Sequence, residues 1–144
     1  MIELPPLPRN QRSVDANHLK LLSIFHFVAA GLALMGILFL LAHYTFMHAI
    51  MDNSRLWQRS KQGPPPVEIF MILKWFYAVF ALWFVGSGIL NLISGLCIRA
   101  RKYRTFSLVV AGLDCVHIPF GTVLGVFTII VLLRDSVREA YGEA

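Results

Sequence analysis

The chain has 144 residues, of which 57% are hydrophobic and only 15% are charged. Soluble domains are about 45–50% apolar and about 25% charged, so the composition excludes an ordinary water-soluble protein. Thirteen Lys and Arg residues against eight Asp and Glu residues give a formal net charge of +5. These basic residues flank long apolar runs, which is typical of membrane proteins and argues against nucleic-acid binding. The expected partner is therefore the lipid bilayer.

Residues 1–14 are polar and rich in proline, which predicts a disordered tail. The first apolar run, residues 19–42, follows Asp15 and Asn17, either of which can cap a helix. This run is longer than the roughly 7–15 apolar residues of a signal peptide, and no small-x-small cleavage site follows it. Since a helix rises about 1.5 Å per residue, the run can cross a hydrocarbon core of about 30 Å. We therefore expect a transmembrane helix.

A segment of mixed character, residues 43–66, follows the first span. Its beginning can prolong the helix or lie in the membrane interface, and its last four residues, Gly-Pro-Pro-Pro, stop any helix. The second span is expected over residues 67–97, where Lys74 separates an amphipathic start from an apolar core. Trp75 and Tyr77, close to this lysine, suit the aromatic belt at a membrane surface.

The last apolar region contains two short helical segments, residues 103–118 and 121–134, on either side of Pro119. Each segment is only about 20 Å long, whereas both together exceed the bilayer core. The region therefore forms either one kinked helix or a short hairpin that turns at residues 119–121.

Charge placement favours the hairpin. The basic cluster at residues 99–104 is expected in the cytoplasm, and Lys20 agrees with an N-terminus on the same side. A hairpin returns Arg134 and Arg138 to that side, whereas a single kinked helix would place them outside. Basic residues within the 43–66 segment weaken the signal without reversing it. Both termini are therefore expected in the cytoplasm.

Small residues recur at helical spacing within the predicted spans, and small residues let membrane helices approach closely. The expected helix-packing positions are Ala33, Gly36, Gly88, Gly95, Gly121 and Gly125. Gly121 and Gly125 form a GxxxG string, which can pack either inside the chain or against a second copy. The sequence favours neither use over the other.

The candidate intramembrane site consists of four polar side chains from the predicted spans: His26, Asn91, Asp114 and His117. Ionisable residues in a span commonly serve a function. Asp114 and His117 share one predicted helical face, so a hydrogen bond between them would suit a proton relay or the surroundings of a metal. The alternative, which we favour, is that both lie near the turn, where water reaches them, and bond backbone groups. His26 is expected near the cytoplasm and His117 near the outer side.

A second, weaker candidate is a metal site at His43, Met47, His48 and Met51. His43, Met47 and Met51 recur every four residues, and their imidazole and thioether groups suit copper. An ordinary interfacial segment whose methionines fill gaps explains the same pattern, and we favour that interpretation. The sequence identifies no cofactor, and it contains no nucleophile elbow, phosphate-binding glycine loop or zinc-binding spacing. We therefore expect no enzyme activity.

Two stretches of the chain are distinctive. The first reads HLKLLSIFHF at residues 18–27, and the second includes YRTF at 103–106, AGLDC at 111–115 and PFGTVLGVFTIIVL at 119–132. Both stretches resemble a group of small, uncharacterised bacterial inner-membrane proteins with about four predicted transmembrane helices. The middle of the chain carries little of this resemblance. It implies a location in the bacterial inner membrane and supplies no catalytic residues.

The fold expected from these observations is all-α: an integral membrane helical bundle in one domain, with four membrane-inserted segments and a hairpin between the third and fourth. The expected function is that of a non-enzymatic subunit or accessory protein that packs against other membrane helices, either of a second copy or of a larger complex. Two alternatives remain open. One is a metal, haem or proton-handling site built on His26, Asp114 and His117, and the other is a small channel or transporter.

Overall fold

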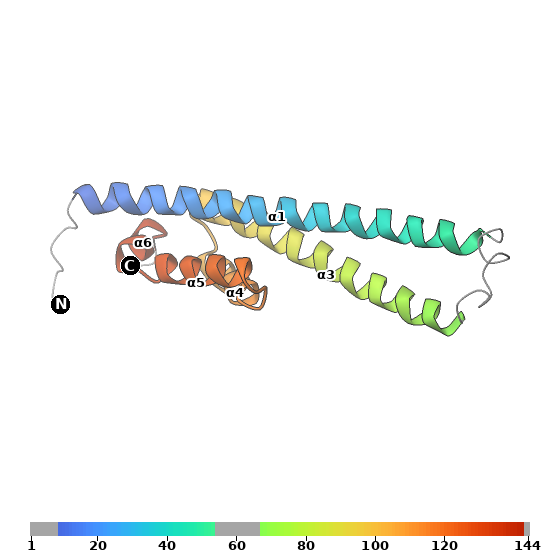
Figure 1. The fold of residues 1–144 in the computed structure, drawn as a ribbon. Coiled ribbons are helices and arrows are strands. Elements are labelled where there is room, and N and C mark those ends of the chain that lie inside the picture. Colours follow the sequence, from blue (N-terminus) through green and yellow to red (C-terminus); the bar gives the residue numbers. More distant parts are fainter. Residues whose placement is uncertain (1–8, 54–66, 143–144) are drawn as a thin grey trace. The chain divides into compact units, whose positions relative to one another are not determined.

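A computed structural model describes residues 9–53 and 67–142. These residues form five helices and no β-strand, so the described part of the chain is all-α, as predicted. The helices are α1 (Arg9–Asp52), α3 (Val67–Ala100), α4 (Arg104–Asp114), α5 (Phe120–Leu132) and α6 (Asp135–Ala140) (Figure 1).

Helix α1 has 44 residues and extends the predicted span of residues 19–42 at both ends. The predicted disordered tail is wrong for residues 9–14, which are helical, whereas residues 1–8 lie outside the described residues. The expected cap is also wrong, because Asp15 and Asn17 both lie inside the helix. Tertiary contacts explain the difference: the Asp15 carboxylate accepts hydrogen bonds from side chains near the C-terminus, which anchor these turns.

The C-terminal end of α1 settles an alternative that the sequence left open. Residues 43–52 prolong the first helix, while residues 54–66 lie outside the described residues. Helix α3 begins where the second span was predicted and has 34 residues, so it runs three residues beyond the expected end at Cys97.

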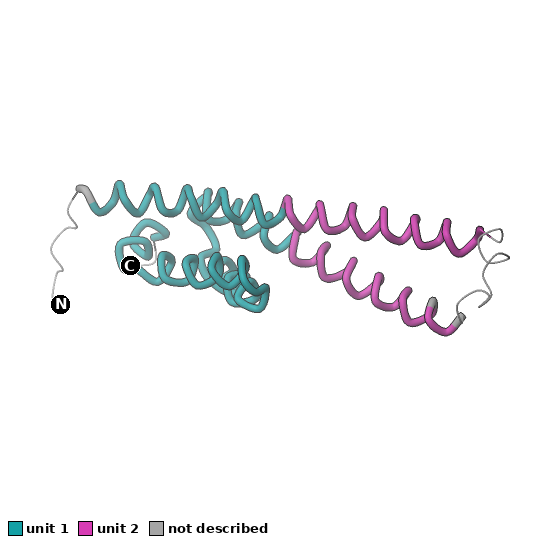
Figure 2. The backbone as a smooth tube through the Cα atoms, viewed as in Figure 1, with its two compact units in different colours: residues 1–30, 89–144 teal, residues 31–88 magenta. Residues whose placement is uncertain are grey.

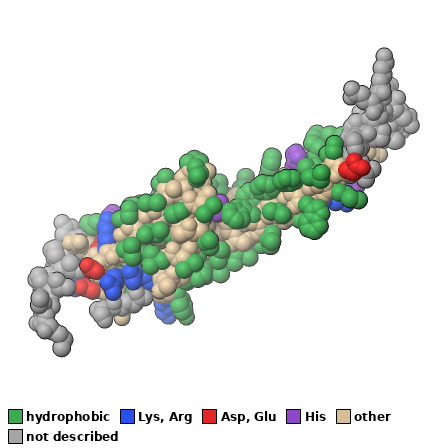
Figure 3. Space-filling model, turned by 90° about the horizontal axis from the view of Figure 1, so that it is seen from below, with side chains coloured by type: hydrophobic (Ala, Val, Ile, Leu, Met, Phe, Trp, Pro, Cys, Tyr) green, Lys and Arg blue, Asp and Glu red, His purple; other side chains and the backbone are tan. Residues whose placement is uncertain are grey.

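Within residues 9–53 and 67–142, two stretches are long and apolar enough to cross a membrane, Gln11–Asp52 and Met71–Ala100. The chain itself buries only 11% of the apolar window in the first stretch and 6% in the second. The core helix of a soluble protein would be mostly buried, so these helices differ from it in presenting large apolar side chains outward. Hydrophobic side chains accordingly cover much of the visible face in Figure 3.

The chain divides into two compact units (Figure 2). Unit 1 comprises residues 1–30 and 89–144, and unit 2 comprises residues 31–88. In unit 2, Gly36 lets α1 approach Phe84 of α3, because a Cβ added to Gly36 would come within 2.7 Å of the Phe84 ring. Gly36 therefore serves the helix packing that its spacing predicted.

In unit 1, α4 and α5 form an antiparallel hairpin. The Arg104 side chain, at the start of α4, donates a hydrogen bond of 2.8 Å to the carbonyl of Leu132 at the end of α5. The chain turns at residues 115–119 and not at the predicted residues 119–121, because Pro119 is the N-cap of α5. Proline suits the start of a helix, where its missing N–H is not needed. The two helical segments are consequently shorter than the predicted residues 103–118 and 121–134.

Unit 1 also contains an apolar core. Its buried members are Leu19, Leu22, Ile98, Val131, Leu132 and Val137. Val137 belongs to α6, a six-residue helix that the sequence did not predict. Asp15 holds this helix to α1, since its carboxylate accepts hydrogen bonds from Arg134 at 3.1 Å and from Ser136 at 2.5 Å.

Candidate functional site

Four buried polar side chains form one hydrogen-bonded chain inside unit 1, and each comes from a different helix. They are His26 of α1, Asn91 of α3, Asp114 of α4 and Thr128 of α5, and each is exposed by 4% or less. We call these four residues the polar tetrad. Three of them were in the predicted intramembrane site, and the structure brings those three together although they are far apart in the sequence.

The hydrogen bonds of the tetrad determine which of its polar atoms donate and which accept. His26 Nδ1 lies 2.7 Å from Asn91 Oδ1, and Asn91 Nδ2 donates to Asp114 Oδ1 at 2.8 Å. Because an amide oxygen can only accept, Nδ1 carries the His26 proton. In a neutral ring Nε2 is then an acceptor, and the hydroxyl of Thr128 donates to it from 3.3 Å. Every bond in the chain therefore has one donor and one acceptor when His26 is neutral.

The carboxylate of Asp114 has one oxygen that this chain of bonds does not use. Oδ2 lies 3.8 Å from His26 Nδ1, and it has no hydrogen-bond partner among the described residues. The Asp114 side chain is only 6% exposed. A buried carboxylate oxygen without a partner is energetically costly, so this oxygen is the chemically unsatisfied point of the tetrad.

Close packing of α1 on α3 makes the contact between His26 and Asn91 possible. One turn before His26, the Ser23 hydroxyl donates to the carbonyl of Gly95 at 2.9 Å. A Cβ on Gly95 would come within 2.8 Å of the Phe27 ring and 3.2 Å of the Ser23 carbonyl oxygen. Gly95 is therefore a packing residue, as predicted from its spacing, and its missing side chain lets the two helices approach.

The GxxxG string has an equivalent role within the hairpin. A Cβ on Gly125 would collide with the Ala111 carbonyl oxygen and come within 2.7 Å of Cys115 Sγ, and a Cβ on Gly121 would collide with His117 and Asp114. The sequence left open whether this string packs inside the chain or against a second copy. In the structure it packs inside the chain. Ala33 is buried and Gly88 is half-buried at the remaining predicted packing positions.

His117, the fourth predicted site residue, lies in the turn after α4. Its backbone N–H donates to the Asp114 carbonyl at 2.8 Å. The expectation that Asp114 and His117 share a helical face is wrong, because α4 ends at Asp114. The Asp114 carboxylate meets Asn91 and His26, and His117 also interacts with it electrostatically.

Thr128 is the tetrad member that sequence reasoning did not assign to the site. Its position three residues after Gly125 places it on the inward face of α5, and that periodicity was the available signal. A threonine hydroxyl in an apolar helix can bond its own backbone, so periodicity alone does not identify a bond to another helix.

The tetrad offers no ring nitrogen for a metal. Both nitrogens of His26 take part in hydrogen bonds, to Asn91 and Thr128. Among the described residues, no group of three or more His, Cys, Asp or Glu side chains is arranged to hold a metal ion. Both ring nitrogens of His26 are therefore engaged within the tetrad, and proton binding at Asp114 is chemistry that this geometry allows.

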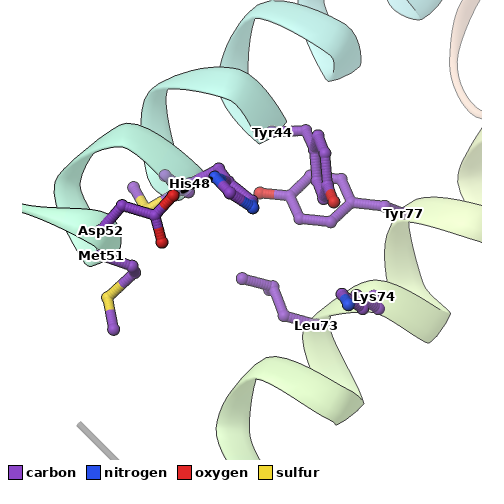
Figure 4. Close-up of a pocket in the computed structure, with 8 residues that line it drawn as sticks. Tyr44, His48, Met51, Asp52, Leu73, Lys74 and Tyr77 are labelled. Atoms are coloured by element: carbon purple, nitrogen blue, oxygen red, sulfur yellow. Dashed lines mark ion pairs between the residues drawn. The ribbon is translucent and has the colours of Figure 1, made fainter. Parts of the chain in front are cut away.

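The second predicted cluster lies in unit 2, and its four residues do not share one site. His43 Nδ1 bonds to the hydroxyl of Tyr77, and the His43 ring stacks on Phe39. Met47, His48 and Met51 instead line a groove of about 220 Å³ between α1 and α3, shown in Figure 4. His43 does not line this groove, so the four residues do not converge on one point.

No protein-family model matches the chain, and no curated protein or solved structure matches it either.

Proposed function

We propose that the chain is a small multi-pass protein of the bacterial inner membrane, a helical bundle with four membrane-inserted segments. Two long apolar helices whose large side chains point outward support the two complete spans. The α4–α5 hairpin supplies the other two segments. Its helices of 11 and 13 residues reach about 17–20 Å, so the hairpin enters the hydrocarbon without crossing it.

The turn of the hairpin suits a position inside the bilayer. Irregular backbone is tolerated at membrane depth only where its polar groups are satisfied by protein or by water. The amides of residues 115–118 all donate to carbonyls within or just before the turn. The most exposed large side chains of the turn and of the first residue of α5 are apolar: Val116, Ile118 and Phe120 are 67%, 84% and 84% exposed. Such an apolar surface suits contact with lipid.

The basic residues support an orientation with both termini in the cytoplasm. Lys20 lies in the first third of α1, the cluster at residues 99–104 follows or ends α3, and Arg134 follows α5, and this topology puts all of these basic residues toward one side. The positive-inside rule places that side in the cytoplasm. The segment between α1 and α3 is then outside.

The tetrad supports a non-enzymatic role in which the bound ligand is a proton. Its polar atoms bond one another across four helices, so they face the protein and no substrate cavity is needed to explain them. The single observation that carries this proposal is Asp114 Oδ2, which is buried, faces His26 at 3.8 Å, and has no hydrogen-bond partner among the described residues.

A proton bound at the tetrad would change its charge and its hydrogen bonds together. With an ionised Asp114 and a neutral His26 the tetrad carries one negative charge. One added proton, on Asp114 Oδ2 or on His26 Nε2, makes it neutral overall. If the proton is on Nε2, Thr128 has to accept a bond instead of donating one. Because each residue belongs to a different helix, proton binding is coupled to helix packing.

The resulting proposal is a proton-responsive subunit or helper of other membrane helices. Capture of the tagged full-length protein from native membranes, at about pH 5 and pH 8, tests it. We expect a membrane protein that co-purifies in a pH-dependent amount with the wild type and in a constant amount with Asp114→Asn. If no membrane protein co-purifies at either pH, the subunit role is wrong. If Asp114→Asn keeps the full pH dependence, the tetrad is not the proton site.

A further inference from the structure

The groove in unit 2 gathers soft metal ligands that the tetrad does not contain. It lies between the end of α1 and the beginning of α3. Its lining residues are Tyr44, Met47, His48, Met51, Asp52, Leu73, Lys74 and Tyr77 (Figure 4). Two thioethers and an imidazole therefore border one space of about 220 Å³.

The spacing of these donors places them within one turn of α1. Met47 and Met51 are separated by four residues and His48 and Met51 by three, which are the separations at which helical side chains are neighbours. Methionine is unbranched and flexible, so two thioethers from one helix can converge on a common ion. Thioether sulfur is a soft ligand that selects Cu(I), and imidazole binds copper as well.

Asp52 contacts the ring of His48. Its Oδ2 lies 3.0 Å from His48 Nδ1, in a contact between neighbouring turns of α1. Histidines that bind metals commonly donate their other ring N–H to a carboxylate, which fixes the orientation of the ring and makes it more basic. With Nδ1 held by Asp52, Nε2 is the nitrogen that can bind an ion. Figure 4 shows the Asp52 carboxylate beside the His48 ring.

We propose that Met47, His48 and Met51 bind one Cu(I) ion in this groove, with Asp52 as the positioning residue for His48. Harder ions do not fit the donor set, because Zn²⁺ prefers three or four imidazole, thiolate or carboxylate ligands. The described residues contain no group of three such side chains.

The test is a titration of the purified full-length protein with Cu(I), under anaerobic conditions and against a chromophoric chelator. The wild type is expected to bind one ion per chain. Replacing both groove methionines, Met47→Leu with Met51→Leu, is expected to abolish this binding, and leucine keeps the side-chain volume. The matched control is Met35→Leu with Met71→Leu, which removes two exposed methionines of the same unit that do not line the groove. The control is expected to bind like the wild type.

Two further measurements make the assignment specific. Asp52→Asn is expected to weaken Cu(I) binding about 10–100-fold, the usual effect of removing a partner of a metal-bound histidine. X-ray absorption at the copper edge is expected to show sulfur neighbours in the wild type and none in the Met47→Leu, Met51→Leu variant. The proposal is wrong if the wild type binds no Cu(I). It is also wrong if groove and control variants bind equally, or if the bound copper has only nitrogen and oxygen neighbours.

Discussion

The ring of His26 and the carboxylate of Asp114 face each other at 3.8 Å in the interior of unit 1, and Asn91 bonds to both. Asn91 is the central member of the tetrad, because its amide accepts from α1 and donates to α4. This relationship makes specific predictions about stability, packing and protonation.

Replacing Asn91 with leucine should destabilise the protein. Asn91→Leu removes the partner of His26 Nδ1 and of Asp114 Oδ1 at once, and each buried polar group left unsatisfied costs about 1–3 kcal/mol. Thermal unfolding in detergent should therefore shift to a clearly lower temperature.

A matched pair of threonine variants checks that the tetrad itself is responsible. Thr128→Val removes a bond between α5 and α1, whereas Thr45→Val removes bonds that an exposed threonine makes to its own helix. Thr128→Val should be the more destabilising of the two. Equal melting temperatures would mean that the bond between Thr128 and His26 contributes nothing measurable.

Replacing two glycines of the hairpin with alanine should change the stability of the protein in opposite directions. Gly125→Ala should destabilise the hairpin, because the new Cβ collides with the Ala111 carbonyl, and overpacking typically costs about 1–3 kcal/mol. Gly112→Ala, on the facing helix α4, meets no atom within 4 Å. It should stabilise the protein by up to about 1 kcal/mol, since alanine favours a helix more than glycine does. If both variants melt alike, the close contact between α4 and α5 is not present in the membrane protein.

Part of this architecture could be predicted from the sequence, and the physical reason is simple. Long apolar runs determine α1 and α3, and charge at the ends of the short segments favours a hairpin. The first and last residues of the helices were harder to predict. The first turns of α1 depend on the bonds of Asp15 to Arg134 and Ser136, and those partners are distant in sequence.

The candidate site could likewise be predicted only in part. Apolar surroundings mark His26, Asn91 and Asp114 as unusual, so the residue types were predictable. Their pairing was not, because it depends on where α4 ends and how closely Gly95 lets α1 and α3 approach. Helical spacing suggested His117 as the partner of Asp114, and the end of α4 removes that spacing.

The proposed topology predicts where single cysteines react in intact cells. Starting from a chain with Cys97→Ser and Cys115→Ser, Glu139→Cys should be protected from an impermeant thiol reagent until the membrane is opened. Ser60→Cys, between α1 and α3, should react from outside. Phe120→Cys should resist the reagent from both sides, because the hairpin turn is proposed to lie in hydrocarbon. Ready labelling of Glu139→Cys in intact cells would show that residues 104–132 cross the membrane.

Infrared titration of the purified protein between about pH 5 and pH 8 tests the central claim, proton binding at the tetrad, most directly. Exposed carboxylates are already ionised over most of this range, so a carboxylic-acid C=O band that changes there marks an unusual carboxyl group. Asp15→Asn is the control, because Asp15 is the other buried carboxylate among the described residues and is bonded to Arg134 and Ser136.

The proposed proton site predicts a pH-dependent change, in this band or in those of the His26 ring, in the wild type and in Asp15→Asn. The change should be absent from Asp114→Asn. Spectra of the wild type and Asp114→Asn that change identically with pH would contradict the proposal and leave the tetrad as a structural connection between four helices.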